Sequence, residues 1–163
     1  MSQILIRRAK QEDAGTLMRL ILELAEFEKL AHEVRASAAD LVREGFGARP
    51  HYEAVLAEED GRALGFALFF FSFSTFEGRP GLHLEDIFVI EEARGRGVGR
   101  KLMASLAKIA VESNCARLDL SVLHWNPARR FYDRLGMEQM VNWVPYRLSG
   151  PNLAQLAAEA DER

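Results

Sequence analysis

The sequence contains one cysteine, Cys115, among its 163 residues. A single cysteine excludes an intramolecular disulfide and is typical of proteins in a reducing compartment. The formal net charge is only −3 at pH 7, and the basic residues are dispersed apart from short clusters. No nucleic-acid partner is therefore expected. No grouping of His, Cys and Asp residues has metal-ligand spacing, so we expect no metal.

Long hydrophobic runs are also missing. The longest, residues 64–71, is interrupted by Gly65 and is far too short to span a bilayer. The first residues lack the apolar stretch and cleavage site of a signal peptide. We therefore expect a cytoplasmic protein with no membrane partner. With 48% hydrophobic and 28% charged residues, the chain predicts a single globular domain over residues 1–163.

Hydrophobic periodicity predicts alternating strands and helices. The predicted strands cover residues 4–6, 52–58, 63–73, 82–90, 117–123 and 139–148, and the predicted helices cover residues 11–30, 38–45, 100–112 and 127–135. Ser37 and Asp40 resemble a capping box, and Asp60-Gly61 is a hairpin signal. The phenylalanine-rich strand 63–73 is expected to be central and buried on both faces. This order predicts an α/β fold, a mixed sheet with helices on its faces.

Three alternating glycines, Gly95, Gly97 and Gly99, lie between a predicted strand and a predicted helix. Such a turn leaves backbone N–H groups pointing outward at the positive end of the helix dipole, which predicts a site for an anion such as a pyrophosphate. A nucleotide P-loop fits poorly because no Gly-Lys-Ser/Thr follows. A dinucleotide fold fits poorly because its second strand and ribose-binding acid do not follow at the expected distance.

The pattern Arg94-x-x-Gly97-x-Gly99 resembles the acyl-CoA pyrophosphate signature of the GNAT acetyltransferase superfamily. Further blocks resemble one branch, the diamine, spermidine/spermine and thialysine N-acetyltransferases, and they lie at residues 24–28, 44–47, 84–89, 124–127, 131–136 and 143–148. The resemblance covers almost the whole chain. It implies a GNAT fold, with a mixed sheet of about six to seven strands flanked by about four helices and splayed between two parallel strands.

The resemblance also implies acetyl-CoA as the co-substrate. The residues that it implies for binding acetyl-CoA are Ile87, Phe88, Val89, Arg94, Gly95, Arg96, Gly97, Val98, Gly99, Arg100, Asn126 and Tyr132. The strand residues would pair with pantetheine through their backbone, and the loop amides would bind the pyrophosphate. Arg96 and Arg100 are equally well explained as solvated surface residues. Asn126 is expected to bind either pantetheine or the start of the helix. It lies six positions before Tyr132, where the family pattern has seven, and one residue fewer shifts the phase of the helix by about 100°.

By resemblance Glu85 is the general base and Tyr132 the general acid that protonates the leaving thiolate. An alkylamine is mostly protonated at neutral pH, a handicap of roughly 4 kcal/mol, which a proton-accepting carboxylate partly offsets. The structural alternatives are a strand carboxylate in an ion pair for Glu85 and an aromatic anchor between helix and sheet for Tyr132.

The expected reaction is acetyl transfer to a primary amine of a small cationic acceptor (a polyamine, diamine or lysine analogue), by direct attack in a ternary complex. The acidic residues implied for the acceptor are Glu26, Glu28, Glu33, Glu85 and Asp86; a solvated acidic helix face is the alternative for the first three. His83 and His124 are weaker candidates for acceptor contacts. The resemblance implies a homodimer, with residues 143–148 near the interface.

Two other functions are compatible with the sequence. A GNAT enzyme could act on another amine, such as an amino acid, an antibiotic or a protein amine. A non-catalytic CoA-binding sensor could keep the glycine loop, but the presence of both Glu85 and Tyr132 argues against it.

Overall fold

The computed structural model describes residues 2–161. The chain divides into two compact units, Met1–Leu123 and His124–Arg163, which we describe separately. That the whole chain forms one functional domain stays a prediction. Among the described residues, no helix has the length and apolar character needed to cross a membrane.

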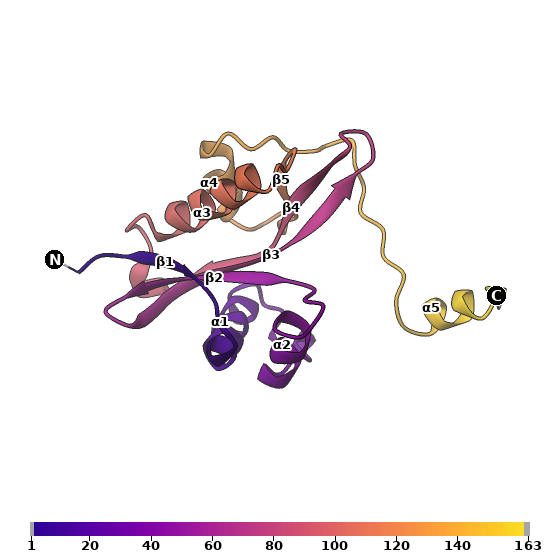
Figure 1. Ribbon diagram of the computed structural model, residues 1–163, viewed down its shortest axis with the longest axis horizontal. Coiled ribbons are helices and arrows are strands. Elements are labelled where there is room, and N and C mark those ends of the chain that lie inside the picture. Colours follow the sequence, from indigo (N-terminus) through magenta and orange to yellow (C-terminus); the bar gives the residue numbers. More distant parts are fainter. Residues whose placement is uncertain (1, 162–163) are drawn as a thin grey trace. The chain divides into compact units, whose positions relative to one another are not determined.

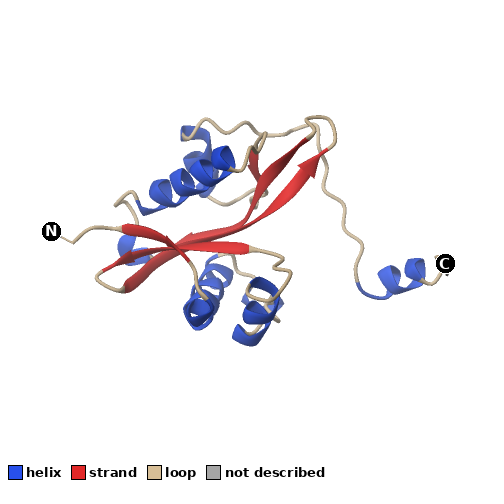
Figure 2. Cartoon of the chain, in the orientation of Figure 1, coloured by secondary structure: helices blue, strands red, loops and turns tan. Residues whose placement is uncertain are grey.

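The first unit is built on a mixed sheet (Figures 1 and 2). Its strands, in their spatial order, are β1 (Leu5–Arg8), β2 (Glu53–Glu59), β3 (Arg62–Ser74), β4 (Arg79–Val89) and β5 (Leu118–Leu120). The first four are antiparallel neighbours, and β5 lies parallel to β4. Asp60 and Gly61 both have positive φ, 50° and 77°, which is the backbone of the predicted tight hairpin.

Helices cover both faces of this sheet. Figure 1 shows α1 (Ala14–Phe27) and α2 (Ala38–Gly45) on one face and α3 (Val98–Glu112) on the other. The capping box predicted at Ser37 and Asp40 is present. Short 3-10 turns cover Gln11–Asp13, Ala31–Glu33 and Glu91–Ala93, so α1 is shorter at both ends than the helix predicted over residues 11–30.

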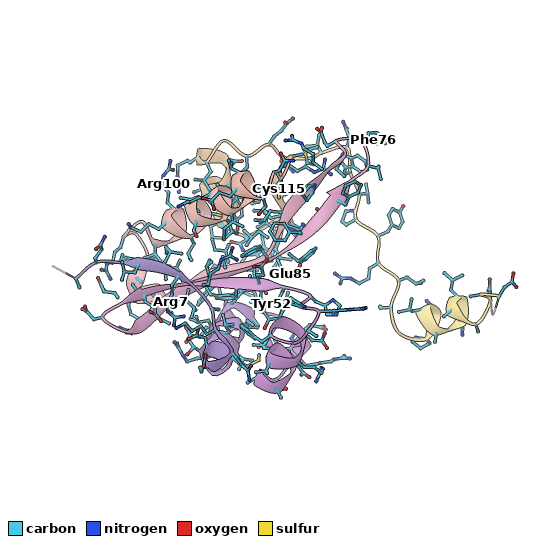
Figure 3. The ribbon with its side chains drawn as sticks, in the orientation of Figure 1. Arg7, Tyr52, Phe76, Glu85, Arg100 and Cys115 are labelled. Carbon is cyan, nitrogen blue, oxygen red and sulfur yellow. The ribbon has the colours of Figure 1, made fainter. Side chains whose placement is uncertain are left out.

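The prediction that β3 is buried on both faces holds for only part of the strand. Phe66 and Phe69 are fully buried between the helical layers, whereas Phe71 and Phe73 are exposed. Figure 3 shows Phe76 at the far tip of the β3–β4 hairpin, where its side chain is fully exposed. The hairpin is longer than the helices that cover the sheet, so its outer end lies in water.

The second unit contains α4 (Ala128–Arg134) and α5 (Gly150–Ala157). The strand predicted over residues 139–148 is not formed, and Figure 2 shows loop between the two helices. A strand needs a neighbour for its backbone N–H and C=O groups, and residues 139–148 pair with no strand in the described chain. The described chain therefore has five strands and five α-helices, where we expected about six to seven and about four.

Candidate functional site

Among the described residues, β4 has strand neighbours on both sides only near its middle. It pairs with β5 only at His83↔Asp119 and the residue pairs on either side, ending at Leu84↔Leu120. On its other side β4 continues beside β3 as far as Val89. Within residues 2–161, the backbone edge of β4 that faced β5 has no strand partner beyond Leu84. The predicted opening between two parallel strands therefore lies here, along Ile87, Phe88 and Val89.

Glu85 lies at a β-bulge where this opening begins. Leu84 pairs with Phe69 and Asp86 pairs with the adjacent Leu68, so Glu85 is the extra residue on β4. A bulge changes the direction of a side chain and is frequent beside active sites. The Glu85 side chain is 56% exposed, and its carboxylate lies 3.8 Å from Nε2 of His83. The candidate base, labelled in Figure 3, is therefore accessible to solvent.

Asp86, the next residue, has a different environment. Burial raises the pKa of its carboxyl to about 6, and the nearby charges of Glu85 and Glu28 contribute in the same direction. Glu28 follows the last residue of α1, and burial also raises its pKa. Like charges held together in a partly desolvated place favour a cation, which would relieve their repulsion.

The other two acidic candidates do not join this group. Glu26 and Glu33 are exposed, and Glu33 lies 3.4 Å from the ring of His32. The structure therefore brings together Glu28, Glu85 and Asp86. Glu26 and Glu33 fit better the alternative of solvated acidic residues on the surface.

The glycine loop leads directly into α3. Gly95 and Gly97 have φ of 75° and 79°, a left-handed conformation that favours glycine. At this end of the helix, the N–H group of Lys101 donates to the carbonyl of Gly97 at 3.0 Å. The first N–H groups of a helix have no acceptor within it, so those of Val98, Gly99 and Arg100 can bind an anion. The loop therefore fits a pyrophosphate.

The three arginines around this loop differ in their partners. Arg96 forms a two-pronged ion pair with Glu59 at 2.6 and 3.1 Å, and this pair lowers the pKa of Glu59. Arg94 donates to the carbonyl of Val89 at 3.0 Å, and its guanidinium lies over the rings of Phe27 and Phe88. Arg100, labelled in Figure 3, is exposed and makes no ion pair with the described residues. Arg100 is thus the arginine whose charge is most available to a phosphate.

In the second unit, Asn126 is buried and its Oδ1 accepts the backbone N–H of Ala128 at 2.9 Å. Asn126 thus fixes the start of α4, one of the two roles expected for it. Tyr132 is buried on the same helix, with its ring centroid 5.5 Å from that of Phe131. The catalytic and coenzyme-binding roles of these two residues stay predictions.

Asp119 is not among the residues that the sequence predicts for the site, although its carboxylate lies 2.8 Å from Nδ1 of His83. The ring of His83 packs against Phe70, with centroids 4.9 Å apart. The signal for this pair is the register of two parallel strands, which residue patterns do not give. Among the described residues, no group of three or more His, Cys, Asp or Glu side chains could hold a metal ion.

The raised pKa of Asp86 predicts how an Asp86→Asn variant depends on pH. Between about pH 4 and 6 the unfolded chain releases the Asp86 proton while the folded protein retains it, so the stability of the wild type falls as the pH rises through this window. Asn does not ionise, so its burial has no cost that grows with pH. Urea unfolding should therefore show the variant to be more stable than wild type by up to roughly 3 kcal/mol at pH 8, and much less so at pH 4.

The matched control is Asp133→Asn, the same change at an exposed position of α4. Its effect on the free energy of unfolding should be small and equal at the two pH values. An Asp86→Asn effect that is independent of pH would contradict the desolvation of this carboxyl.

Comparisons with known proteins agree with this geometry. The model of the acetyltransferase (GNAT) family matches residues 14–137. Thialysine N-epsilon-acetyltransferase of Bos taurus is 37% identical over 98% of this chain and 100% of its own length. Spermidine/spermine N(1)-acetyltransferase-like protein 1 of Homo sapiens is 30% identical over 94% of this chain, which corresponds to 24% of that protein.

A solved structure, an integron cassette protein from the mobile metagenome of V. cholerae, is similar to this chain with a TM-score of 0.80 and 30% identity. It covers 94% of this chain, which covers 97% of that structure. The glycine turn, the opening after Leu84 and these similarities lead to one conclusion. The chain belongs to the acetyltransferase (GNAT) family and is an N-acetyltransferase.

Proposed function

We propose that the protein transfers an acetyl group from acetyl-CoA to a primary amine of a small cationic molecule: a polyamine, a diamine or a lysine analogue. The observation that carries this proposal is the carboxylate group of Glu28, Glu85 and Asp86, whose repulsion a second positive charge on the acceptor would relieve. The relatives support it, since thialysine, spermidine and spermine each carry more than one amino group.

Glu85 is the proposed general base. The acceptor amine must lose a proton before it can attack, and its protonation at neutral pH costs roughly 4 kcal/mol. The Glu85 carboxylate is exposed at the bulge, so it can take this proton directly or through one water molecule. The neutral amine would then attack the acetyl carbonyl in a ternary complex.

Acetyl-CoA supplies the activated acetyl group as a thioester. Its pyrophosphate fits the amides of Val98, Gly99 and Arg100, and its pantetheine fits the unpaired edge of β4. Tyr132 is the proposed general acid for the leaving thiolate, on the basis of the family pattern alone.

Substitution of the two proposed catalytic residues tests the mechanism. Glu85→Gln and Tyr132→Phe should each lower kcat about 10²–10⁴-fold at neutral pH with spermidine, putrescine or thialysine, because each removes a proton-transfer group. The rate is measured as free thiol released from acetyl-CoA. Butylamine, a monoamine, should be a poorer acceptor than putrescine because it lacks the second charge.

Rates with a set of amine acceptors also distinguish the proposed function from the two other candidate functions. Efficient turnover only with an antibiotic or a protein amine would favour the second kind of GNAT enzyme. Binding of CoA in a calorimeter without turnover of any amine would favour the sensor. A Tyr132→Phe enzyme of near wild-type rate would remove Tyr132 from the mechanism.

The coenzyme loop can be tested with two matched glycine variants. Gly97 and Gly78 both have positive φ, and an added Cβ at either would meet nothing within 4 Å. Alanine at each should therefore destabilise the fold similarly, by about 1–2 kcal/mol. Only Gly97→Ala should raise the KM for acetyl-CoA, by about tenfold, because its methyl group lies beside the anion-binding amides. Equal KM values for both variants would argue against this loop as the pyrophosphate site.

We further propose that the enzyme is a cytoplasmic homodimer with residues 143–148 near its interface. The cytoplasmic location is supported by Cys115, because a free cysteine is typical of proteins in a reducing compartment. Support for the dimer comes from the apolar side chains of residues 140–148. Trp143 is 76% exposed and Tyr146 95% exposed, and apolar groups gathered in this way mark interaction sites.

Light scattering tests the dimer. Wild type should have twice the protomer mass, and Trp143→Glu should shift the protein toward the monomer because a charge would be buried at the interface. The control is Val111→Glu, since Val111 is as exposed as Trp143 but lies on α3. A monomeric wild type would refute the proposal, as would equal effects of both variants.

A further inference from the structure

His83 lies between two carboxylates, one residue before the pairing of β4 with β5 ends. Its Nδ1 is 2.8 Å from the Asp119 carboxylate, and its Nε2 is 3.8 Å from the Glu85 carboxylate. The first distance is a hydrogen bond. The second is too long for a hydrogen bond, and one bridging water molecule or a small side-chain rotation would connect the two groups. The two ring nitrogens thus face different acids.

The fold places these groups by strand register. His83 and Asp119 are direct partners in the parallel pairing of β4 and β5. Glu85 follows two residues along β4, at the bulge. On the neighbouring strand β3, the ring of Phe70 packs against the imidazole and restricts its orientation.

Asp119 determines which nitrogen of His83 carries the proton. A carboxylate can only accept, so Nδ1 donates to Asp119 and the neutral ring keeps its lone pair on Nε2, facing Glu85. The guanidinium of Arg117 lies 3.4 Å from the other oxygen of Asp119. The charged groups that face His83 are therefore Asp119, with Arg117 behind it, and Glu85.

We propose that Asp119 and His83 form a proton relay that returns Glu85 to its charged form after each turnover. The inference rests on the proposed function, in which Glu85 accepts a proton from the acceptor's ammonium group. That proton passes from the Glu85 carboxyl to Nε2 of His83, and the resulting imidazolium is stabilised by Asp119. The His83 side chain is 27% exposed, so the imidazolium can then release this proton to water. The nitrogen loses a second proton as the amide forms, and this proton replaces the one that Tyr132 gives to the thiolate. One net proton therefore leaves per acetyl group transferred.

His83 is a positioning residue in this scheme, because it acts on the reaction through Glu85. His83→Phe keeps an aromatic ring against Phe70 and removes the proton acceptor. It should lower kcat about tenfold at low buffer concentration and change the KM for the amine less than twofold. Added imidazole should restore much of the lost rate, since a small base in solution can take the proton from Glu85.

A matched control is available in His51, whose Nε2 lies 3.5 Å from the Glu44 carboxylate outside the site. His51→Phe should keep wild-type kcat and should not respond to imidazole. Asp119→Asn should lower kcat several-fold with the same KM, because an amide no longer fixes the tautomer.

A second measurement needs no turnover. Long-range ¹H–¹⁵N NMR spectra of the histidine rings should show neutral His83 protonated on Nδ1 in the wild type and a mixture of tautomers in Asp119→Asn. If His83→Phe does not fold, this measurement is combined with the kcat of Asp119→Asn: protonation of wild-type His83 on Nε2, or an Asp119→Asn enzyme of wild-type kcat, would contradict the relay.

The outcomes separate the relay from the proposed function. A His83→Phe enzyme with wild-type kcat overturns the relay, and so does a loss of rate without imidazole rescue or a wild-type His83 protonated on Nε2. If Glu85→Gln retains full activity, or no amine is acetylated, the proposed function fails instead. Loss of activity in Glu85→Gln together with imidazole rescue of His83→Phe supports both.

Discussion

The parallel pairing of β4 and β5 is the constraint on which the site depends. This pairing ends at Leu84 and Leu120, while β4 continues beside β3 to Val89. Three of the features proposed for acetyl transfer lie just after that point on β4: the bulged Glu85, the partly buried Asp86 and the free backbone edge. The same strand then leads to the glycine turn. β4 therefore carries the proposed base, one of the carboxylates proposed to attract the acceptor, and the backbone edge proposed for pantetheine.

The carboxylates of Glu28, Glu85 and Asp86 lower the stability of the fold and at the same time favour the binding of a cation. Burial and two neighbouring carboxylates raise the pKa of Asp86 to about 6, so an ionised Asp86 at neutral pH destabilises the folded protein. A bound polycation would reverse the sign of this interaction, because each carboxylate would gain an opposite charge. Binding energy that depends on the relief of repulsion favours acceptors with more than one positive charge over monoamines.

Local signals in the sequence predicted local structure well. The Asp60-Gly61 turn, the Ser37 capping box and the glycine turn before α3 all depend on residues close in the chain, and all are present. Residues 139–148 have a strand-like pattern but form no strand, because pairing depends on a neighbour that the pattern does not contain. The bulge at Glu85 and the His83–Asp119 pair likewise depend on register between strands. Glu85 was predicted from the family resemblance and His83 only as a weaker candidate for acceptor contacts, whereas the pairing of His83 with Asp119 was not predicted.

Glu85 and Asp86 differ in exposure, and this difference suits them to different proposed roles. Glu85 and Asp86 follow each other in the sequence, yet Glu85 is exposed beside His83, whereas Asp86 is partly buried near Glu28. A base that must be deprotonated in every cycle needs a route to water, and an exposed carboxylate next to an imidazole has one. A carboxylate that attracts a cation gains from desolvation, since Coulombic attraction strengthens as water is excluded. The bulge separates these two environments, because it adds one residue to β4 at the point where its neighbour β5 ends.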